Sequence, residues 1–139
     1  MRISVSSRLL SIILLILPII ILLVKTPPSP DDNTTSLTSV TFEADSSLNS
    51  IGDYAFRETG LTSITIPPLV ESIGLGAFWL TKFEVVNIPK SVTSIGVAAF
   101  NRSALTTVTF EADISFGGIP NNMFYAASNL KTITIPASV

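Results

Sequence analysis

Residues 61–78 read LTSITIPPLVESIGLGAF, and residues 83–100 follow the same pattern as FEVVNIPKSVTSIGVAAF. Across the 139-residue chain the pattern restarts at intervals of 24, 22, 22 and 25 residues, at Leu37, Leu61, Phe83, Leu105 and Leu130. A repeat of this length is typical of stacked coils. We therefore predict a repeat solenoid, mostly β, with four full repeats and a partial fifth over residues 37–139.

The first half of each repeat predicts a short strand. In Ile64, Thr65 and Ile66, apolar and polar side chains alternate and all are β-branched, which suits a strand with one buried face. Pro67 removes a backbone donor and ends the strand.

The second half of each repeat keeps fixed apolar spacings of three and then five residues. The sets are Leu48–Ile51–Phe56, Val70–Ile73–Phe78, Val92–Ile95–Phe100 and Phe116–Ile119–Phe124. We expect Ile73, Ile95 and Ile119 to align in one interior column. Gly74, directly after Ile73, predicts a turn that a residue with a Cβ would strain.

These residues resemble the BspA-like leucine-rich-repeat family, whose unit reads roughly Leu-x-x-Ile-x-Ile-Pro, x-Val-x-x-Ile-Gly and Ala-Phe. The resemblance covers residues 37–139 and implies a solenoid of the leucine-rich-repeat type that binds or adheres at a surface without catalysis. The family often carries a cysteine after Ala-Phe, where Thr59 and Ala127 stand here. The fourth repeat also departs, with Ile119-Pro120 in place of Ile-Gly and Met123-Phe124 in place of Ala-Phe.

The amino-terminal segment predicts a membrane helix ahead of the solenoid. Residues 9–24 are Leu, Ile and Val, interrupted only by Ser11 and Pro18, and would span about 24 Å as a helix. Residues 1–25 therefore read as an uncleaved signal-anchor. The alternative is a cleaved secretory signal, although no Ala-x-Ala site is present. Arg2 and Arg8 precede the segment and place the amino terminus in the cytoplasm and the repeats outside. Residues 26–36 form a Pro/Ser/Thr-rich spacer.

The charge and composition exclude several function classes. The chain has eight basic and ten acidic residues, a net charge of −2, and no basic run, so nucleic acid is not an expected partner. The absence of histidine and cysteine removes the usual zinc ligands and the commonest catalytic bases and nucleophile pairs. We therefore predict no enzyme activity, no metal and no cofactor.

The carboxylates allow two interpretations. Glu43 with Asp45 and Glu111 with Asp113 occur in identical Phe-Glu-Ala-Asp settings, and paired carboxylates in loops can bind calcium. The preferred interpretation is that they are solvated turn residues that keep the surface soluble. A carboxylate hydrolase would need a cleft holding two acids such as Glu71 and Glu84, which is not expected.

Polar side chains of the predicted strands should form an exposed ladder. Adjacent strands lie about 4.8 Å apart, and repeat proteins bind ligands on such faces. The candidate binding residues form two columns: Ser39, Ser63, Val85, Thr107 and Thr132; and Thr41, Thr65, Asn87, Thr109 and Thr134. The ligand would be a protein or a glycan. Threonine is also simply a good exposed strand residue. Rows of Thr-x-Thr resemble ice-binding surfaces too, but Val85 and Asn87 interrupt them.

Two further sets of residues are candidates. Trp79 and Tyr125 are possible aromatic contacts at one edge of the solenoid, although Trp79 could equally pack over the loop. Asn33 and Asn101 begin Asn-x-Ser/Thr sequons and are possible glycosylation sites, with Asn33 in the spacer the more accessible.

Together these features predict a surface binding or adhesion module held outside the membrane. The alternative is a truncated fragment of a longer repeat protein without an independent role, because the sequence stops inside a repeat, at ITIPASV. Such an end lacks a polar capping unit and predicts self-association through the last strand.

Mass spectrometry of the mature amino terminus tests the anchor. An uncleaved signal-anchor leaves Met1 or Arg2 at the start of the protein purified from its host. A mature start between Pro27 and Asp31 would instead identify residues 1–25 as a secretory leader.

Overall fold

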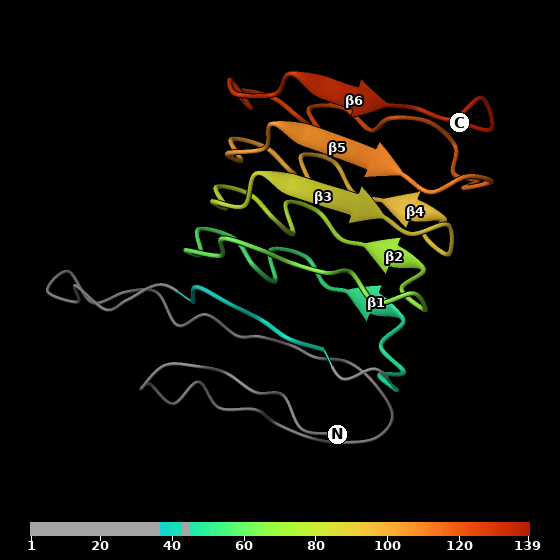
Figure 1. Ribbon diagram of the computed structural model, residues 1–139, viewed down its shortest axis with the longest axis horizontal. Helices are drawn as coiled ribbons and strands as arrows, with labels where there is room; N and C mark the ends of the chain where they lie inside the picture. The colour runs from blue at the N-terminus through green and yellow to red at the C-terminus, as the bar shows by residue number, and fades with distance from the viewer. Residues whose placement is uncertain (1–36, 43–44) are drawn as a thin grey trace, which may run out of the picture.

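The computed structural model describes residues 37–42 and 45–139, which wind into coils stacked one above another (Figure 1). The five passes through the first half of the repeat are residues 37–42, 61–66, 83–88, 105–110 and 130–135, and we number the coils one to five from them. The predicted repeat solenoid with short parallel strands is therefore confirmed for the described part of the chain.

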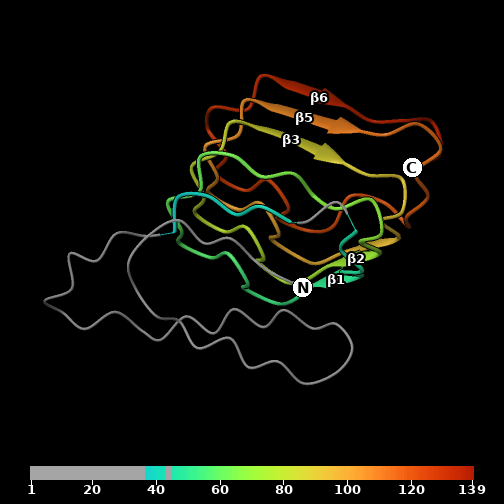
Figure 2. The same cartoon turned by 60° about the horizontal axis from the view of Figure 1, so that its bottom comes forward.

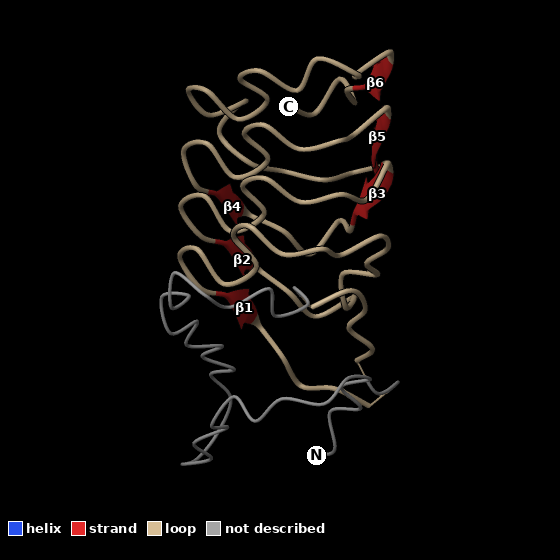
Figure 3. Ribbon diagram, turned by 90° about the vertical axis from the view of Figure 1, so that its left-hand side faces the viewer, coloured by secondary structure: helices blue, strands red, loops and turns tan. Residues whose placement is uncertain are grey.

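Two parallel sheets lie on opposite sides of the stack (Figure 3). The ladder sheet contains β3 (Val85–Ile88), β5 (Thr107–Phe110) and β6 (Thr132–Thr134), in that order. The return sheet contains β1 (Ser50–Ile51), β2 (Ser72–Ile73) and β4 (Ser94–Ile95). The interior enclosed by the coils lies between the two sheets (Figure 2).

The register between coils follows the sequence repeat. Val86 pairs with Val108, and Val108 pairs with Ile133 in the ladder sheet. Ile51, Ile73 and Ile95 align in the same way in the return sheet and are all buried. Apolar residues of equivalent positions therefore meet across coils, as the spacing predicts.

A column of phenylalanine rings runs through the interior. Phe56, Phe78, Phe100 and Phe124 stack with centroid separations of 5.4, 5.2 and 5.9 Å and interplanar angles of 4°, 12° and 19°. Phe78 and Phe100 are completely buried because a ring lies on each side of them. Offset aromatic stacking at these distances adds to the free energy gained by burial.

Buried hydroxyl groups close the turns that follow the first two rings. Thr59 Oγ1 donates to the carbonyl of Phe56 at 2.8 Å, and Thr81 Oγ1 donates to that of Phe78 at 2.9 Å. Thr59, at the position where the resemblance leads one to expect cysteine, therefore satisfies a buried backbone acceptor, which would otherwise cost free energy.

The turns around each phenylalanine use the left-handed backbone region at two fixed positions. Two residues before the ring the φ angles are +55° to +57°, at Tyr54, Gly76, Ala98 and Asn122. Two residues after the ring they are +52° to +57°, at Glu58, Leu80, Arg102 and Ala126. This region costs a residue with a Cβ about 1–2 kcal/mol. In return, alternate N–H groups point along the stack: Phe56 N–H donates to Ala77 O, and Phe78 N–H to Ala99 O, each at 2.8 Å.

The predicted role of Gly74 was wrong in its mechanism. Gly74 and Gly96 do not adopt a positive φ angle, whereas Gly76 and Gly118 do. A Cβ on Gly74 would lie 2.6 Å from the backbone nitrogen of Asp53, and one on Gly96 would overlap the backbone of Leu75. Both glycines are needed because adjacent coils approach closely, and not because of a turn.

The predicted interior position of Ile119 was also wrong. Ile119 is 40 % exposed, although Ile73 and Ile95 are buried. The fourth coil forms no strand at residues 116–119, since Gly117 and Gly118 favour no extended structure and Pro120 has no N–H to donate. Ile114 and Met123 of the same coil are buried in the core instead.

The predicted membrane segment, residues 9–24, the signal-anchor of residues 1–25 and the spacer of residues 26–36 all lie outside the described residues. Within residues 37–42 and 45–139, no helix is long and apolar enough to cross a bilayer.

Alanine substitutions at two glycines test the close approach of the coils. Gly74→Ala should lower the free energy of unfolding by about 1–3 kcal/mol because the new methyl group meets backbone that cannot move aside. Gly52→Ala is the matched control, since a Cβ there meets nothing within 4 Å. It should leave stability unchanged or raise it by about 0.4–1 kcal/mol. Urea unfolding followed by circular dichroism measures both, and equal losses would contradict this packing.

Candidate binding face

The predicted columns of polar residues are in register on the ladder sheet. Val85 pairs with Thr107 and Thr107 with Thr132, while Asn87 pairs with Thr109 and Thr109 with Thr134. Their side chains alternate with the buried residues of the same strands, so they face away from the core. We call these six residues the ladder face.

A hydrogen-bonded network fixes the middle of the ladder face. Thr109 Oγ1 donates to Asn87 Oδ1 at 2.9 Å, and Asn87 Nδ2 donates to Glu111 Oε1 at 3.2 Å. The backbone N–H of Lys90 donates to Glu111 Oε2 at 3.0 Å. Asn87 and Glu111 are exposed, so the network presents charge and amide groups to solvent in a fixed arrangement.

Glu111 is a component of the face that sequence reasoning missed. The sequence suggested a solvated turn residue or, less favourably, one of a pair of calcium ligands with Asp113. In the structure both carboxylate oxygens of Glu111 accept hydrogen bonds from the neighbouring coil. Among the described residues no group of three or more acidic side chains could hold a metal ion. The useful signal would have been the 24-residue separation of Asn87 and Glu111, close to one repeat.

The threonine rows have only part of the regularity that an ice-binding surface needs. Thr107 and Thr109 lie in register with Thr132 and Thr134, but Val85 and Asn87 occupy the same two columns in the coil before. The Thr109 hydroxyl donates to Asn87, so it is not free to order water in a repeating lattice.

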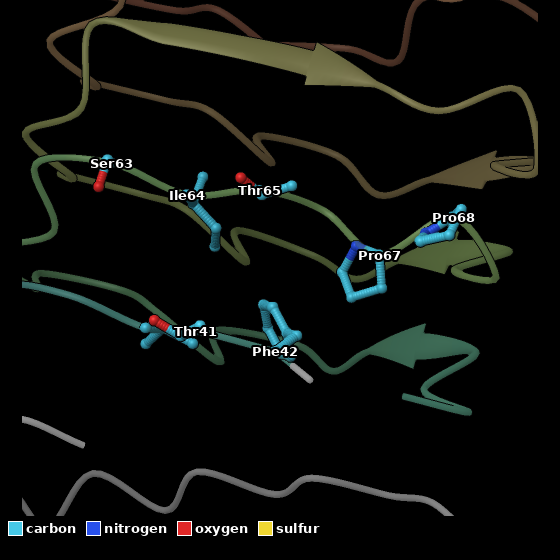
Figure 4. A pocket seen from close by; sticks show the side chains of 8 residues that line it. Thr41, Phe42, Ser63, Ile64, Thr65, Pro67 and Pro68 are labelled. Atoms are coloured by element: carbon cyan, nitrogen blue, oxygen red, sulfur yellow. The ribbon is translucent and has the colours of Figure 1, made fainter. Parts of the chain in front are cut away.

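The first two coils extend the two columns without regular strand pairing. Thr41, Ser63 and Thr65 are exposed and line a shallow cleft of about 400 Å³ together with Phe42 and the proline turn of the second coil (Figure 4). Ser39 is half-buried. The polar surface therefore continues beyond the ladder face and gains an aromatic ring at its amino-terminal end.

The structure does not bring the two candidate aromatic contacts together. Trp79 belongs to coil two and is partly buried beneath Arg57, whose guanidinium carbon lies 4.9 Å from the ring centroid. Tyr125 belongs to coil four and is 60 % exposed. Asn101 of coil three, which is buried, occupies the equivalent position between them. Trp79 therefore packs over the loop, and the exposed Tyr125 lies two coils further along the stack.

The sequon at Asn101 does not fit the folded chain. Its side chain is only 7 % exposed, so a glycan there would require the third coil to open. Asn33 lies outside the described residues. The acids Glu71 and Glu84 are both exposed and belong to different halves of the repeat.

Comparisons with known proteins agree with this geometry. The family profile described as a BspA type leucine rich repeat region matches residues 32–139 in six copies, against the four full repeats and partial fifth expected from the spacing. The chain is similar to a leucine-rich repeat protein from Eubacterium ventriosum ATCC 27560, of known crystal structure, with 24 % identity and a TM-score of 0.54. That match covers 69 % of this chain and 35 % of the other, and it shows the shared fold. No curated protein matches the chain.

Proposed function

Because the chain belongs to the BspA-type leucine-rich-repeat family, we propose that it is a non-catalytic binding module whose ladder face contacts a ligand outside the cell. The repeats of this family are generally not catalytic. A module of this kind needs a rigid surface with regularly spaced hydrogen-bonding groups, and parallel stacking of identical coils supplies one.

The observation that carries the proposal is the exposure of an in-register polar surface above a buried core. Coils three to five align Val85, Thr107 and Thr132 on the same side as the Asn87–Thr109–Glu111 network. Strand pairing fixes the backbone of this surface, and hydrogen bonds hold the side chains of Asn87, Thr109 and Glu111, so these three lose little side-chain entropy when a ligand binds. Hydroxyl and amide groups can both donate to and accept from a ligand, and the carboxylate can accept, which suits a protein or a glycan.

The proposed location follows from the amino-terminal sequence alone. Residues 9–24 would anchor the protein in the membrane with the amino terminus in the cytoplasm, and residues 26–36 would hold the solenoid close to the outer surface. In the alternative, residues 1–25 are removed and the solenoid is secreted. A second alternative for function is that the chain is a fragment of a longer repeat protein.

Self-association is a further part of the proposal. Ile133 and Ile135 are 38 % and 47 % exposed, whereas the equivalent Val108 and Phe110 are buried by the next coil. β6 is also the last strand of its sheet, and such edges tend to pair with another chain.

Size-exclusion chromatography with light scattering tests this edge on residues 26–139. The fragment should run as a dimer or larger species, and Ile133→Lys should shift it toward monomer because a charge on an edge strand opposes pairing. A monomer at every concentration would contradict self-association.

The ladder face is tested by two nearly isosteric substitutions. Thr107→Val with Thr132→Val removes two hydroxyl groups while retaining the β-branched shape, so stability should change little. Loss of two hydrogen bonds at about 0.5–1.5 kcal/mol each should weaken binding roughly 5- to 150-fold. Binding is measured by biolayer interferometry against immobilised cell-surface glycans and extracellular proteins.

The control for this experiment is Asn49→Ala, at an exposed residue directly before β1 of the return sheet. It should bind like the parent chain to every member of the panel. If Asn49→Ala lost binding while the paired ladder variant kept it, the ligand would contact the other side of the solenoid and the ladder face would be excluded.

A further inference from the structure

The return sheet has no strand in coil four, although the chain passes along that side of the stack again there. β4 is its last strand, and residues 116–119 of coil four, which should continue the sheet, form no strand. The ladder sheet, by contrast, continues through β5 of coil four to β6 of coil five. The two sheets therefore end at different levels, and an unpaired edge lies within the stack.

The missing pairing leaves two backbone acceptors at this edge. In the earlier coils Ile51 O accepts from Gly74 N at 2.8 Å, and Ile73 O accepts from Gly96 N at 2.7 Å. The corresponding donor for Ile95 O would come from Pro120, which has no N–H. The carbonyl of Ile95 thus receives no hydrogen bond from coil four.

The carbonyl of Thr93 also receives no hydrogen bond from coil four. Its counterpart in the coil before, Glu71 O, accepts from Thr93 N at 2.8 Å. The equivalent donor in coil four is Gly117 N, and no hydrogen bond joins it to Thr93 among the described residues. Two carbonyl groups, two residues apart on one strand edge, have the spacing that another extended chain would satisfy.

A groove of about 450 Å³ lies along this edge. Thr93, Ser94, Ile95 and Val97 form one side of it, and residues 116–121 form the other. Val97 and Ile119 are 46 % and 40 % exposed, which gives the groove an apolar rim. None of its lining residues carries a charge, so an uncharged segment fits it best.

The groove is closed at one end, which limits what can enter. Coil four rejoins coil three directly after the groove, where Ala98 N–H donates to Asn121 O at 3.1 Å and Phe100 N–H donates to Met123 O at 3.0 Å. A single extended chain can reach the edge of β4 beside residues 116–121. The edge of a second folded solenoid would meet these residues first.

We propose that the edge of β4 binds an extended, uncharged peptide segment of a partner protein. Two N–H groups of the peptide donate to the carbonyls of Thr93 and Ile95, and an apolar side chain packs against Val97 and Ile119. Strand addition at an exposed sheet edge is a general mode of peptide recognition. This site is separate from the ladder face and does not depend on its function.

A variant that restores the repeat in coil four closes the site. Gly117→Thr, Gly118→Ser and Pro120→Gly together give this coil the Thr-Ser-Ile-Gly sequence of residues 93–96. The variant should extend the return sheet by one strand and abolish peptide binding. Val97→Ser, which removes only part of the rim, should weaken binding, and Leu69→Ser, an exposed leucine outside the groove, should not.

The probe is a fluorescein-labelled peptide of sequence GTVTVTG, titrated with the full chain and followed by fluorescence anisotropy. N-methylation of one alternate set of its amides should weaken binding about 10-fold or more, since it removes the donors that face β4. Methylation of the other set, which faces away, should change it little.

Three results would overturn the proposal. The parent chain could fail to bind the unmethylated peptide, or it could bind both methylated peptides equally well. Light scattering could also show a dimer that the restored coil-four variant converts to monomer, while Ile133→Lys does not, which would assign the groove to a second copy.

Discussion

The structure depends on each coil burying the apolar side chains of its neighbours. Phe78 and Phe100 are buried because another ring stacks on each side of them, and Ile73 is buried between Ile51 and Ile95 in the return sheet. No coil has enough apolar residues to bury its own core, so ordering one coil alone is opposed by conformational entropy. The stack is therefore stable only as an array.

Close contact between coils also explains the backbone. Gly74 and Gly96 let the chains approach, and left-handed residues at two positions of each turn direct alternate N–H groups along the stack. The cost of placing residues such as Leu80 and Arg102 in this region is offset by hydrogen bonds to the next coil. The ladder face follows from the same stacking, because only coils in register place Thr107 beside Thr132.

The sequence alone was sufficient to predict the structural features that recur in the repeats without exception. The period and the three-then-five spacing predicted the alignment of Ile73 with Ile95 and the register of the ladder columns. It was insufficient where one residue type has two uses: glycine serves both positive φ and close approach, and Gly74 has the second role. The exposure of Ile119 depends on two glycines and a proline acting together. The Asn87–Glu111 hydrogen bond joins different positions of the repeat in two different coils, so no local sequence motif predicts it.

Native-state hydrogen exchange is the most direct test of whether neighbouring coils stabilise one another by burying each other's apolar residues. If the coils stabilise one another, the amides of Phe78 and Phe100, which donate to the following coil from the middle of the stack, should exchange most slowly and through one common opening reaction. The amides of β6, with a coil on one side only, should exchange fastest among the strands. Equal protection of every coil, or a central coil that opens on its own while its neighbours stay protected, would contradict this account.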